Sequence, residues 1–211
     1  MTVTKDQILG WLKACAAEFA AQQDYLTDLD REIGDADHGL NMNRGFTKVM
    51  EKLPTFEAQP IGGIMKGVGM TLMSSIGGAS GPLYGTFFIR AATSTASAEE
   101  LDLAALIKML EDGVAGVVMR GKAEHGDKTM CDVWWPVLQA AKEAKDAGSD
   151  ITAALDKMVA AAEEGAKSTI PMQARKGRAS YLGERSVGHQ DAGATSSLIM
   201  IKALAATVSG S

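Results

Sequence analysis

Aromatic residues are scarce in this chain and make up only 5% of its 211 residues. Its apolar positions are filled mainly by Ala, Leu, Ile and Met, which favours closely packed helices over a sandwich or barrel of strands. No stretch approaches the roughly 18 uninterrupted apolar residues of a membrane-spanning helix. The N-terminal residues include Lys5 and Asp6 and no apolar signal region. We therefore expect an all-α protein of the cytoplasm that does not interact with a membrane.

Cysteine is equally rare, and positive charge is in deficit. Cys15 and Cys131 lie in apolar helical stretches without the paired spacing of a zinc site, so we expect buried thiols in a reducing compartment. Lys and Arg together number 21 against 26 Asp and Glu, a net charge of -5. This balance argues against a nucleic-acid-binding protein that relies on a global positive field. Any anion-binding site must therefore be local.

No Pro- or Ser-rich linker divides the chain, so residues 1–211 are expected to form one domain, long enough to bury roughly 70% of its unfolded surface. Ile8, Leu12, Cys15 and Phe19 recur at helical spacing after Thr4. Similar patterns predict further helices, eight in all, over about 38–52, 60–76, 82–95, 100–120, 130–147, 150–169 and 193–208.

Local start signals support several of these helices. They are capping boxes at Thr4 with Gln7 and at Ser97 with Glu100, Pro82 in the first turn of the fourth helix, and Asp150 as the cap of the seventh. Convincing strands are not predicted anywhere.

Residues 30–37, with the sequence DREIGDAD, place four carboxylates beside backbone-permissive positions at a junction between helices. Two such charges 4 Å apart repel by roughly 4 kcal/mol at an effective dielectric near 20. A hard divalent cation, magnesium or calcium, would offset that cost because it prefers oxygen ligands. Asp and Gly are also ordinary turn and helix-cap residues, so a purely structural interpretation stays open.

Two further junctions have the composition of anion-binding sites. The sequence GGASGP at 77–82 presents consecutive N–H groups at a helix start, an arrangement that can cradle phosphate. Between 173 and 190, Arg175, Lys176, Arg178 and Arg185 face a lone Glu184, which is consistent with an anion clamp. Turn formation for the first segment and a solvated basic loop for the second are the structural alternatives.

The three histidines lie in Gly- and Asp-rich junctions. His38 follows Asp37 directly and His189 precedes Asp191 by two residues, whereas His125 has less support as a functional residue. Phosphohistidine chemistry and a surface role both stay open. Trp134 and Trp135 are expected to pack in a helix, with an adenine shelf as the alternative.

Two motif matches are misleading. GVVMRGK at 116–122 nearly spells a P-loop, but Ala123 replaces the Ser or Thr that would bind magnesium, and no strand precedes it. The acidic segment fails as an EF-hand, because counting from Asp35 puts Leu40 where Gly is needed and Phe46 where Glu is needed.

Taken in order, these motifs resemble those of a known family. They are DREIGDADHGLN at 30–41, GGASGP at 77–82, RGKA at 120–123, GDKTM at 126–130 and GHQD at 188–191. The chain resembles the L subunits of phosphotransferase-system-dependent dihydroxyacetone kinases over nearly its whole length. Its start at Met1 and its length match a free-standing subunit. One departure is Ala192, where this family generally has Pro.

The resemblance implies an antiparallel eight-helix barrel with a nucleotide site at one rim. It implies retained ADP or ATP with two Mg²⁺ ions, and two partners, a dihydroxyacetone-binding subunit and a phosphohistidine-carrying phosphotransferase subunit. The implied metal ligands are Asp30, Asp35 and Asp37. The implied nucleotide-binding residues are His38, Gly39, Leu40, Asn41, Ala79, Ser80, Gly121, Met130, Arg178, Asp191, Ala192 and Gly193.

Three alternatives stay open. One is a related kinase-like domain with another acceptor, such as the nucleotide-binding domain of fatty-acid kinases. A second is a regulatory module whose nucleotide state is recognised by a transcription regulator, which is compatible with catalysis. The third is a structural helical adaptor with an incidental acidic loop.

Overall fold

The computed structural model describes residues 1–210 and is almost entirely helical. The α-helices are α1 (Lys5–Ala21), α2 (Gln23–Ile33), α3 (His38–Lys52), α4 (Ile61–Ser75), α5 (Ser80–Ala91), α6 (Leu103–Gly121), α7 (Cys131–Asp146), α8 (Ile151–Ser168) and α9 (Ala192–Ser209). Two 3-10 segments, η1 (Leu53–Thr55) and η2 (Arg178–Ser186), and two short strands, β1 (Val3–Thr4) and β2 (Glu100–Leu101), complete the described part. The predicted all-α fold is confirmed.

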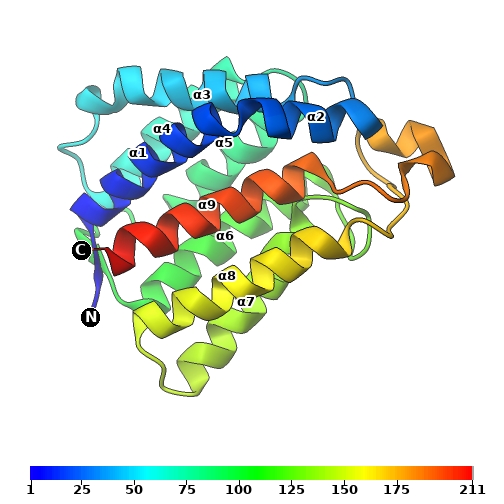
Figure 1. The fold of residues 1–211 in the computed structure, drawn as a ribbon. Coiled ribbons are helices and arrows are strands. Elements are labelled where there is room, and N and C mark those ends of the chain that lie inside the picture. The colour runs from blue at the N-terminus through cyan, green and yellow to red at the C-terminus, as the bar shows by residue number, and fades with distance from the viewer. Residues whose placement is uncertain (211) are drawn as a thin grey trace.

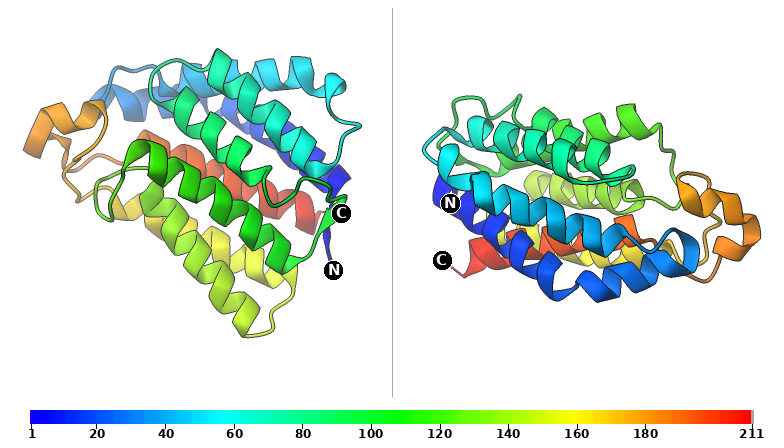
Figure 2. Two further views of the ribbon diagram at one scale, coloured as in Figure 1. Left: turned by 180° about the vertical axis from the view of Figure 1, so that it is seen from behind. Right: turned by 90° about the horizontal axis from the view of Figure 1, so that it is seen from above.

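The helices form a closed ring. From α3 to α9 each α-helix packs against the next along the chain, and α9 returns to pack against α1 (Figures 1 and 2). The helices α1 and α2 meet at Gln22 and together occupy the first position of the ring, since both pack against α3 and α9. The ring therefore has the eight positions that were predicted, although α2 was not predicted as a separate helix.

The helix start signals predicted from the sequence are present with one exception. Thr4 and Gln7 form the predicted capping box, and the Asp150 side chain accepts a hydrogen bond from Ala153 N. The predicted capping box at Ser97 and Glu100 is wrong. Glu100 lies in β2, which pairs with β1, and α6 begins after Asp102, whose carboxylate accepts from Ala105 N at 2.8 Å.

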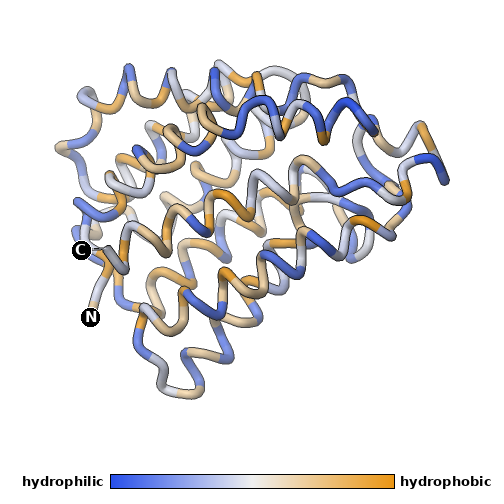
Figure 3. Tube along the Cα trace, viewed as in Figure 1, coloured by the Kyte–Doolittle hydropathy of each residue, from blue (hydrophilic) through white to orange (hydrophobic). Residues whose placement is uncertain are grey.

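Several of the few aromatic side chains gather inside the ring. Phe46 and Phe87 both contact Phe88, and Phe87 stacks on Trp134 with ring centroids 4.8 Å apart. All four side chains are fully buried. In Figure 3 the hydrophobic colours run along the helices, whereas α2 is largely hydrophilic. A small number of large rings thus fills the interior, and Ala and Gly let the helices approach closely.

Cys15 and Cys131 are free and buried, as predicted. Among residues 1–210, α9 is the one helix that is long and apolar enough to cross a membrane by length and composition, and 67% of it is buried inside the protein. That degree of burial is typical of a core helix.

Close helix packing predicts a strong effect of adding one methyl group. A Cβ atom at Gly69 of α4 would lie 2.7 Å from Gly85 O and 2.8 Å from Ile89 N of α5, and backbone atoms cannot rotate away. We expect Gly69→Ala to lower the free energy of unfolding by about 2 kcal/mol, measured by urea denaturation. Gly10→Ala is the matched control, because its nearest neighbour is a single side-chain methyl of Thr207 at 2.9 Å. A control change as large as that at Gly69 would contradict this explanation.

Candidate nucleotide and metal site

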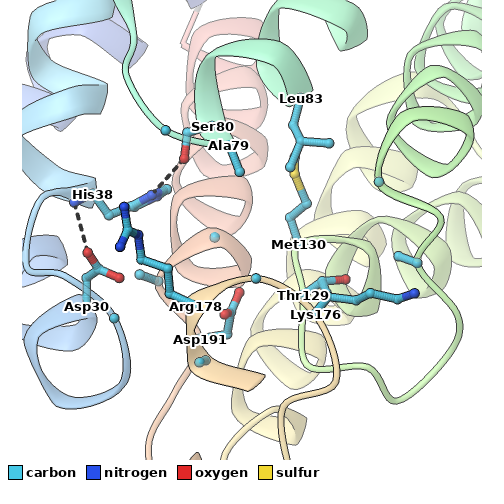
Figure 4. A pocket seen from close by; sticks show the side chains of 18 of the residues that line it. Asp30, His38, Ala79, Ser80, Leu83, Thr129, Met130, Lys176, Arg178 and Asp191 are labelled. Atoms are coloured by element: carbon cyan, nitrogen blue, oxygen red, sulfur yellow. Dashed lines mark hydrogen bonds between the residues drawn. The ribbon is translucent and has the colours of Figure 1, made fainter. Parts of the chain in front are cut away.

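A cavity of about 480 Å³ opens at one end of the ring, where the loops after α2, α4, α6 and α8 meet the start of α9. Figure 4 shows its lining: Asp30, His38 and Arg178 lie on one side, and Leu83 and Met130 lie on another. The chain termini lie at the other end of the ring (Figure 1). The cavity therefore has a charged part and an apolar part.

The charged part contains three carboxylates. Oxygen atoms of Asp30, Asp35 and Asp37 all lie within 4.8 Å of one another. Asp30 is held in place because its Oδ2 accepts hydrogen bonds from the N–H groups of Asp37 at 2.9 Å and His38 at 3.2 Å. This contact joins the last turn of α2 to the first turn of α3. The intervening Ala36 adopts a left-handed conformation with φ 59°, which makes the loop tight enough to gather the carboxylates.

The donor set fits a hard divalent cation. All three candidate ligands are carboxylates, the oxygen donors that hard divalent cations prefer. Asp35 Oδ2 accepts from Arg178 Nε at 2.8 Å, so a guanidinium from η2 already offsets part of the negative charge. The acidic loop can therefore hold a cation and can also be neutralised by the protein itself.

A buried polar network lies beneath these carboxylates. His38 contacts Ser196 Oγ through Nε2 at 2.9 Å. Its Nδ1 contacts Ser80 Oγ at 3.2 Å (Figure 4). The Tyr84 hydroxyl contacts the same Ser196 Oγ at 2.5 Å. Burial lowers the pKa of His38 below its ordinary value, against the opposing effect of the nearby carboxylates Asp30, Asp37 and Asp35. The imidazole is thus a neutral hydrogen-bonding group that fixes the positions of α3, α5 and α9.

The glycine-rich turn before α5 also borders the cavity. Gly77, Gly78, Ala79 and Ser80 line it, and Gly78 has φ +63°, a conformation that favours glycine. No side chain caps the first turn of α5 from the Ala79 position. Its N–H groups and the positive end of the helix dipole are thereby available to an anion.

The apolar part of the cavity is lined by Leu83, Val117, Gly121, Met130 and Cys131. A Cβ atom at Gly121 would lie 3.3 Å from Leu83 Cδ2, so this wall is closely packed. Flat, weakly polar groups fit such a surface better than phosphates do. The two parts of the cavity together match a molecule with an aromatic and an anionic end.

Comparison with known proteins identifies the family. The model of the DAK2 domain matches residues 32–206. The chain belongs to the DAK2 domain family. It is 58% identical over 205 residues to the ADP-binding subunit DhaL of the PEP-dependent dihydroxyacetone kinase of Escherichia coli, covering 97% of this chain and 98% of that protein. It is 42% identical to the corresponding subunit of kinase 1 of Listeria innocua, covering 98% of each. The predicted resemblance is thus confirmed.

A solved structure supports the same fold. The dihydroxyacetone kinase of C. freundii in complex with AMP-PNP and Mg²⁺ matches with a TM-score of 0.71 and 24% identity. The match covers 93% of this chain and 33% of that chain, so a DAK2 fold occurs there as part of a longer protein.

Most of the residues proposed as ligands in this DAK2 protein border the cavity. Those that do are Asp30, Asp35, Asp37, His38, Ala79, Ser80, Gly121, Met130, Arg178, Asp191, Ala192 and Gly193. Gly39, Leu40 and Asn41 are not among the lining residues. Gly39 packs against the backbone of α2, Leu40 is half exposed, and Asn41 accepts a hydrogen bond from Arg44 at 2.6 Å.

The sequence did not indicate several lining residues as nucleotide ligands, among them Leu83, Arg120, Lys128 and Thr129. Lys176, which also lines the cavity, was predicted only as part of the basic segment at 173–190. Lys128 and Thr129 lie in the GDKTM motif, which carried the resemblance, but no local pattern indicated the direction of their side chains. Other candidates lie outside the lining. The His125 ring packs on Trp135 with centroids 3.9 Å apart, and Trp134 is buried in the core, so the structure gives no support for an adenine shelf.

Asp191 connects the cavity to the start of α9. Its Oδ2 accepts from Ala194 N at 2.7 Å and its own N–H donates to Thr169 Oγ1 at 3.0 Å. Burial raises the pKa of Asp191 to about 6, although the hydrogen bond from Ala194 N and the Lys128 ammonium both act to lower it.

This raised pKa predicts a specific pH dependence. The folded metal-free chain protonates Asp191 at a higher pH than the unfolded chain does. The contribution of Asp191 to the free energy of unfolding therefore falls as pH rises from about 4 to about 6. Across this pH window the free energy of unfolding of the wild type should fall by on the order of 1 kcal/mol relative to that of Asp191→Asn. Urea denaturation at each pH measures the difference, and a constant difference would contradict the assignment.

Proposed function

We propose that this chain is the ADP-binding subunit of a cytoplasmic, phosphoenolpyruvate-dependent dihydroxyacetone kinase. The observation that carries the proposal is the combination of one cavity with two chemically distinct parts and the 58% identity to a DhaL subunit over nearly the full length of both chains. A structural adaptor would not need three carboxylates beside an uncapped helix start and an apolar wall.

In the proposed complex, Asp30, Asp35 and Asp37 hold two Mg²⁺ ions. Arg178 and the first-turn N–H groups of α5 contact the phosphates, because both lie at the charged part of the cavity. Leu83 and Met130 contact the base at the apolar part. These residues would hold a retained nucleotide between the charged and the apolar parts of the rim.

When bound with Mg²⁺, the nucleotide would relay a phosphoryl group: as ADP it would accept the group from a phosphohistidine of one partner subunit, and as ATP it would give the group to dihydroxyacetone held on another. The chain itself contributes positioning and charge neutralisation, which is most of what a metaphosphate-like transition state requires. No side chain at the rim stands out as a general base. His38 is neutral and already has two hydrogen-bond partners, so its role is to hold the site together.

The metal site is tested by Asp35→Ala. Asp35 is exposed and its side chain pairs with Arg178 outside the α-helices, so the loss of its carboxylate should leave the helix content unchanged. Loss of one metal ligand should weaken binding of ADP in the presence of Mg²⁺ by at least about 100-fold, or about 2.7 kcal/mol. Isothermal titration calorimetry measures the affinity, and far-UV circular dichroism measures the helix content.

Asp28→Ala is the matched control for this test. Asp28 is exposed on the same helix as Asp30 but pairs with Arg31 outside the carboxylate cluster, so its loss should leave ADP affinity within about twofold of wild type. Equal affinities of the Asp35 and Asp28 variants would refute the proposed metal site.

The identity of the ligands is tested by native mass spectrometry of the purified chain. We expect a mass excess equal to one ADP and two Mg²⁺ ions, which disappears after treatment with a chelator. The same sample should show negligible phosphorylation of dihydroxyacetone until both partner subunits are added. Rapid turnover by the isolated chain would contradict its assignment as one subunit of a relay.

A further inference from the structure

Lys128 is a buried lysine outside the carboxylate cluster. Its side chain is 1% exposed, and its backbone adopts a left-handed conformation with φ 62°. Burying an ammonium group costs several kcal/mol unless its hydrogen bonds and charge are compensated. A lysine without hydrogen-bond partners would therefore destabilise the fold at this position, and the groups around Lys128 offset that cost.

The Lys128 ammonium donates only to main-chain carbonyl oxygens. Nζ lies 2.7 Å from Thr169 O, 3.2 Å from Met172 O and 3.5 Å from Ile170 O, and it also donates to His189 O. Thr169 follows the last turn of α8, where the helix dipole places partial negative charge. The ammonium is thus held in a cage of carbonyl oxygens at a helix C-terminus.

These carbonyls belong to segments far apart in sequence. Lys128 lies in the loop between α6 and α7, Thr169 to Met172 follow α8, and His189 precedes α9. Weaker links run in parallel: Gly188 N donates to Ile170 O at 2.8 Å, and Arg175 N donates to Asp127 O at 3.0 Å. The Lys128 ammonium therefore connects three separate segments of the rim through hydrogen bonds.

Each of these three segments supplies residues to the cavity. The loop before α7 supplies Thr129 and Met130, the segment after α8 supplies Lys176 and Arg178, and the start of α9 supplies Asp191. The apolar and the charged parts of the cavity thus meet at Lys128. The ammonium itself points at the carbonyl cage, so a direct contact with a phosphate would require it to give up its carbonyl contacts.

We propose that Lys128 is a positioning residue, whose ammonium takes the place of a bound monovalent cation in a carbonyl cage and sets the spacing between the two parts of the nucleotide cavity. This role rests on the proposed function only for its effect on ADP affinity. Its effect on the order of the rim segments follows from the hydrogen bonds alone.

The test compares Lys128→Met with the wild type. Methionine keeps the apolar stem of the side chain but is one atom shorter, so it removes the charge and the four carbonyl contacts and leaves the space of Nζ open. We expect helix content near wild type, faster amide hydrogen exchange in residues 169–176 and 188–193 but not in α4, and at least about tenfold weaker ADP binding with Mg²⁺. Lys167→Met is the control, because Lys167 is an exposed lysine in the last turn of α8, and it should change none of the three measurements.

Cation rescue separates positioning from direct ligation. Carbonyl cages bind potassium and ammonium ions, so about 100 mM of either ion, an ionic strength close to physiological, should restore part of the ADP affinity of Lys128→Met. Choline at the same ionic strength should not. Wild type should respond equally to all three salts. Weak ADP binding without faster exchange and without rescue would show a direct ligand role and overturn the proposal.

Lys128→Arg covers the case in which the methionine variant does not fold. Its guanidinium keeps the charge but is too large and planar for the same cage, so we expect a folded chain with faster exchange in the same two segments. Unchanged exchange in the arginine variant would overturn the proposal. Failure of the wild type to bind ADP would refute the proposed function. The exchange measurements would still test the positioning role of Lys128.

Discussion

Mutual repulsion among Asp30, Asp35 and Asp37 is the constraint on which the rim of this barrel depends. Three carboxylates within 4.8 Å stay together only because other groups offset their charge. Two N–H groups at the start of α3 stabilise Asp30, and the guanidinium of Arg178 stabilises Asp35. The same contacts connect α2, α3 and η2, so the electrostatics of the site and the geometry of the loops cannot be separated.

The barrel supplies the rigidity that this arrangement needs. Its helices approach closely where glycine faces a neighbouring backbone, as at Gly69, and the buried rings of Phe87, Phe88 and Trp134 fill the centre. The loops at the rim are therefore mounted on helices with little freedom to shift. Charge of both signs at the rim is then balanced by buried main-chain groups, by carbonyls around Lys128 and by amides around Asp30.

Features encoded locally could be predicted from the sequence, and features that depend on distant partners could not. Apolar periodicity located most helices, and the acidic loop was visible because its ligands lie within eight residues. Helix α2 was missed because only Leu26 and Ile33 are buried in it, too few for a periodic signal. Glu100 was assigned to a capping box because pairing between β1 and β2 joins residues nearly a hundred positions apart. The burial of Lys128 likewise depends on carbonyls 41 to 61 positions away.

Both ends of the described chain lie together, remote from the cavity (Figure 1). The first strand is fixed there by pairing with β2, and α9 runs the length of the ring to reach the same side. A polypeptide fused before Val3 or after α9 would consequently leave the opening unobstructed. Surface immobilisation through either end would likewise present the rim outward, so macromolecules arriving from solution would meet it without steric hindrance.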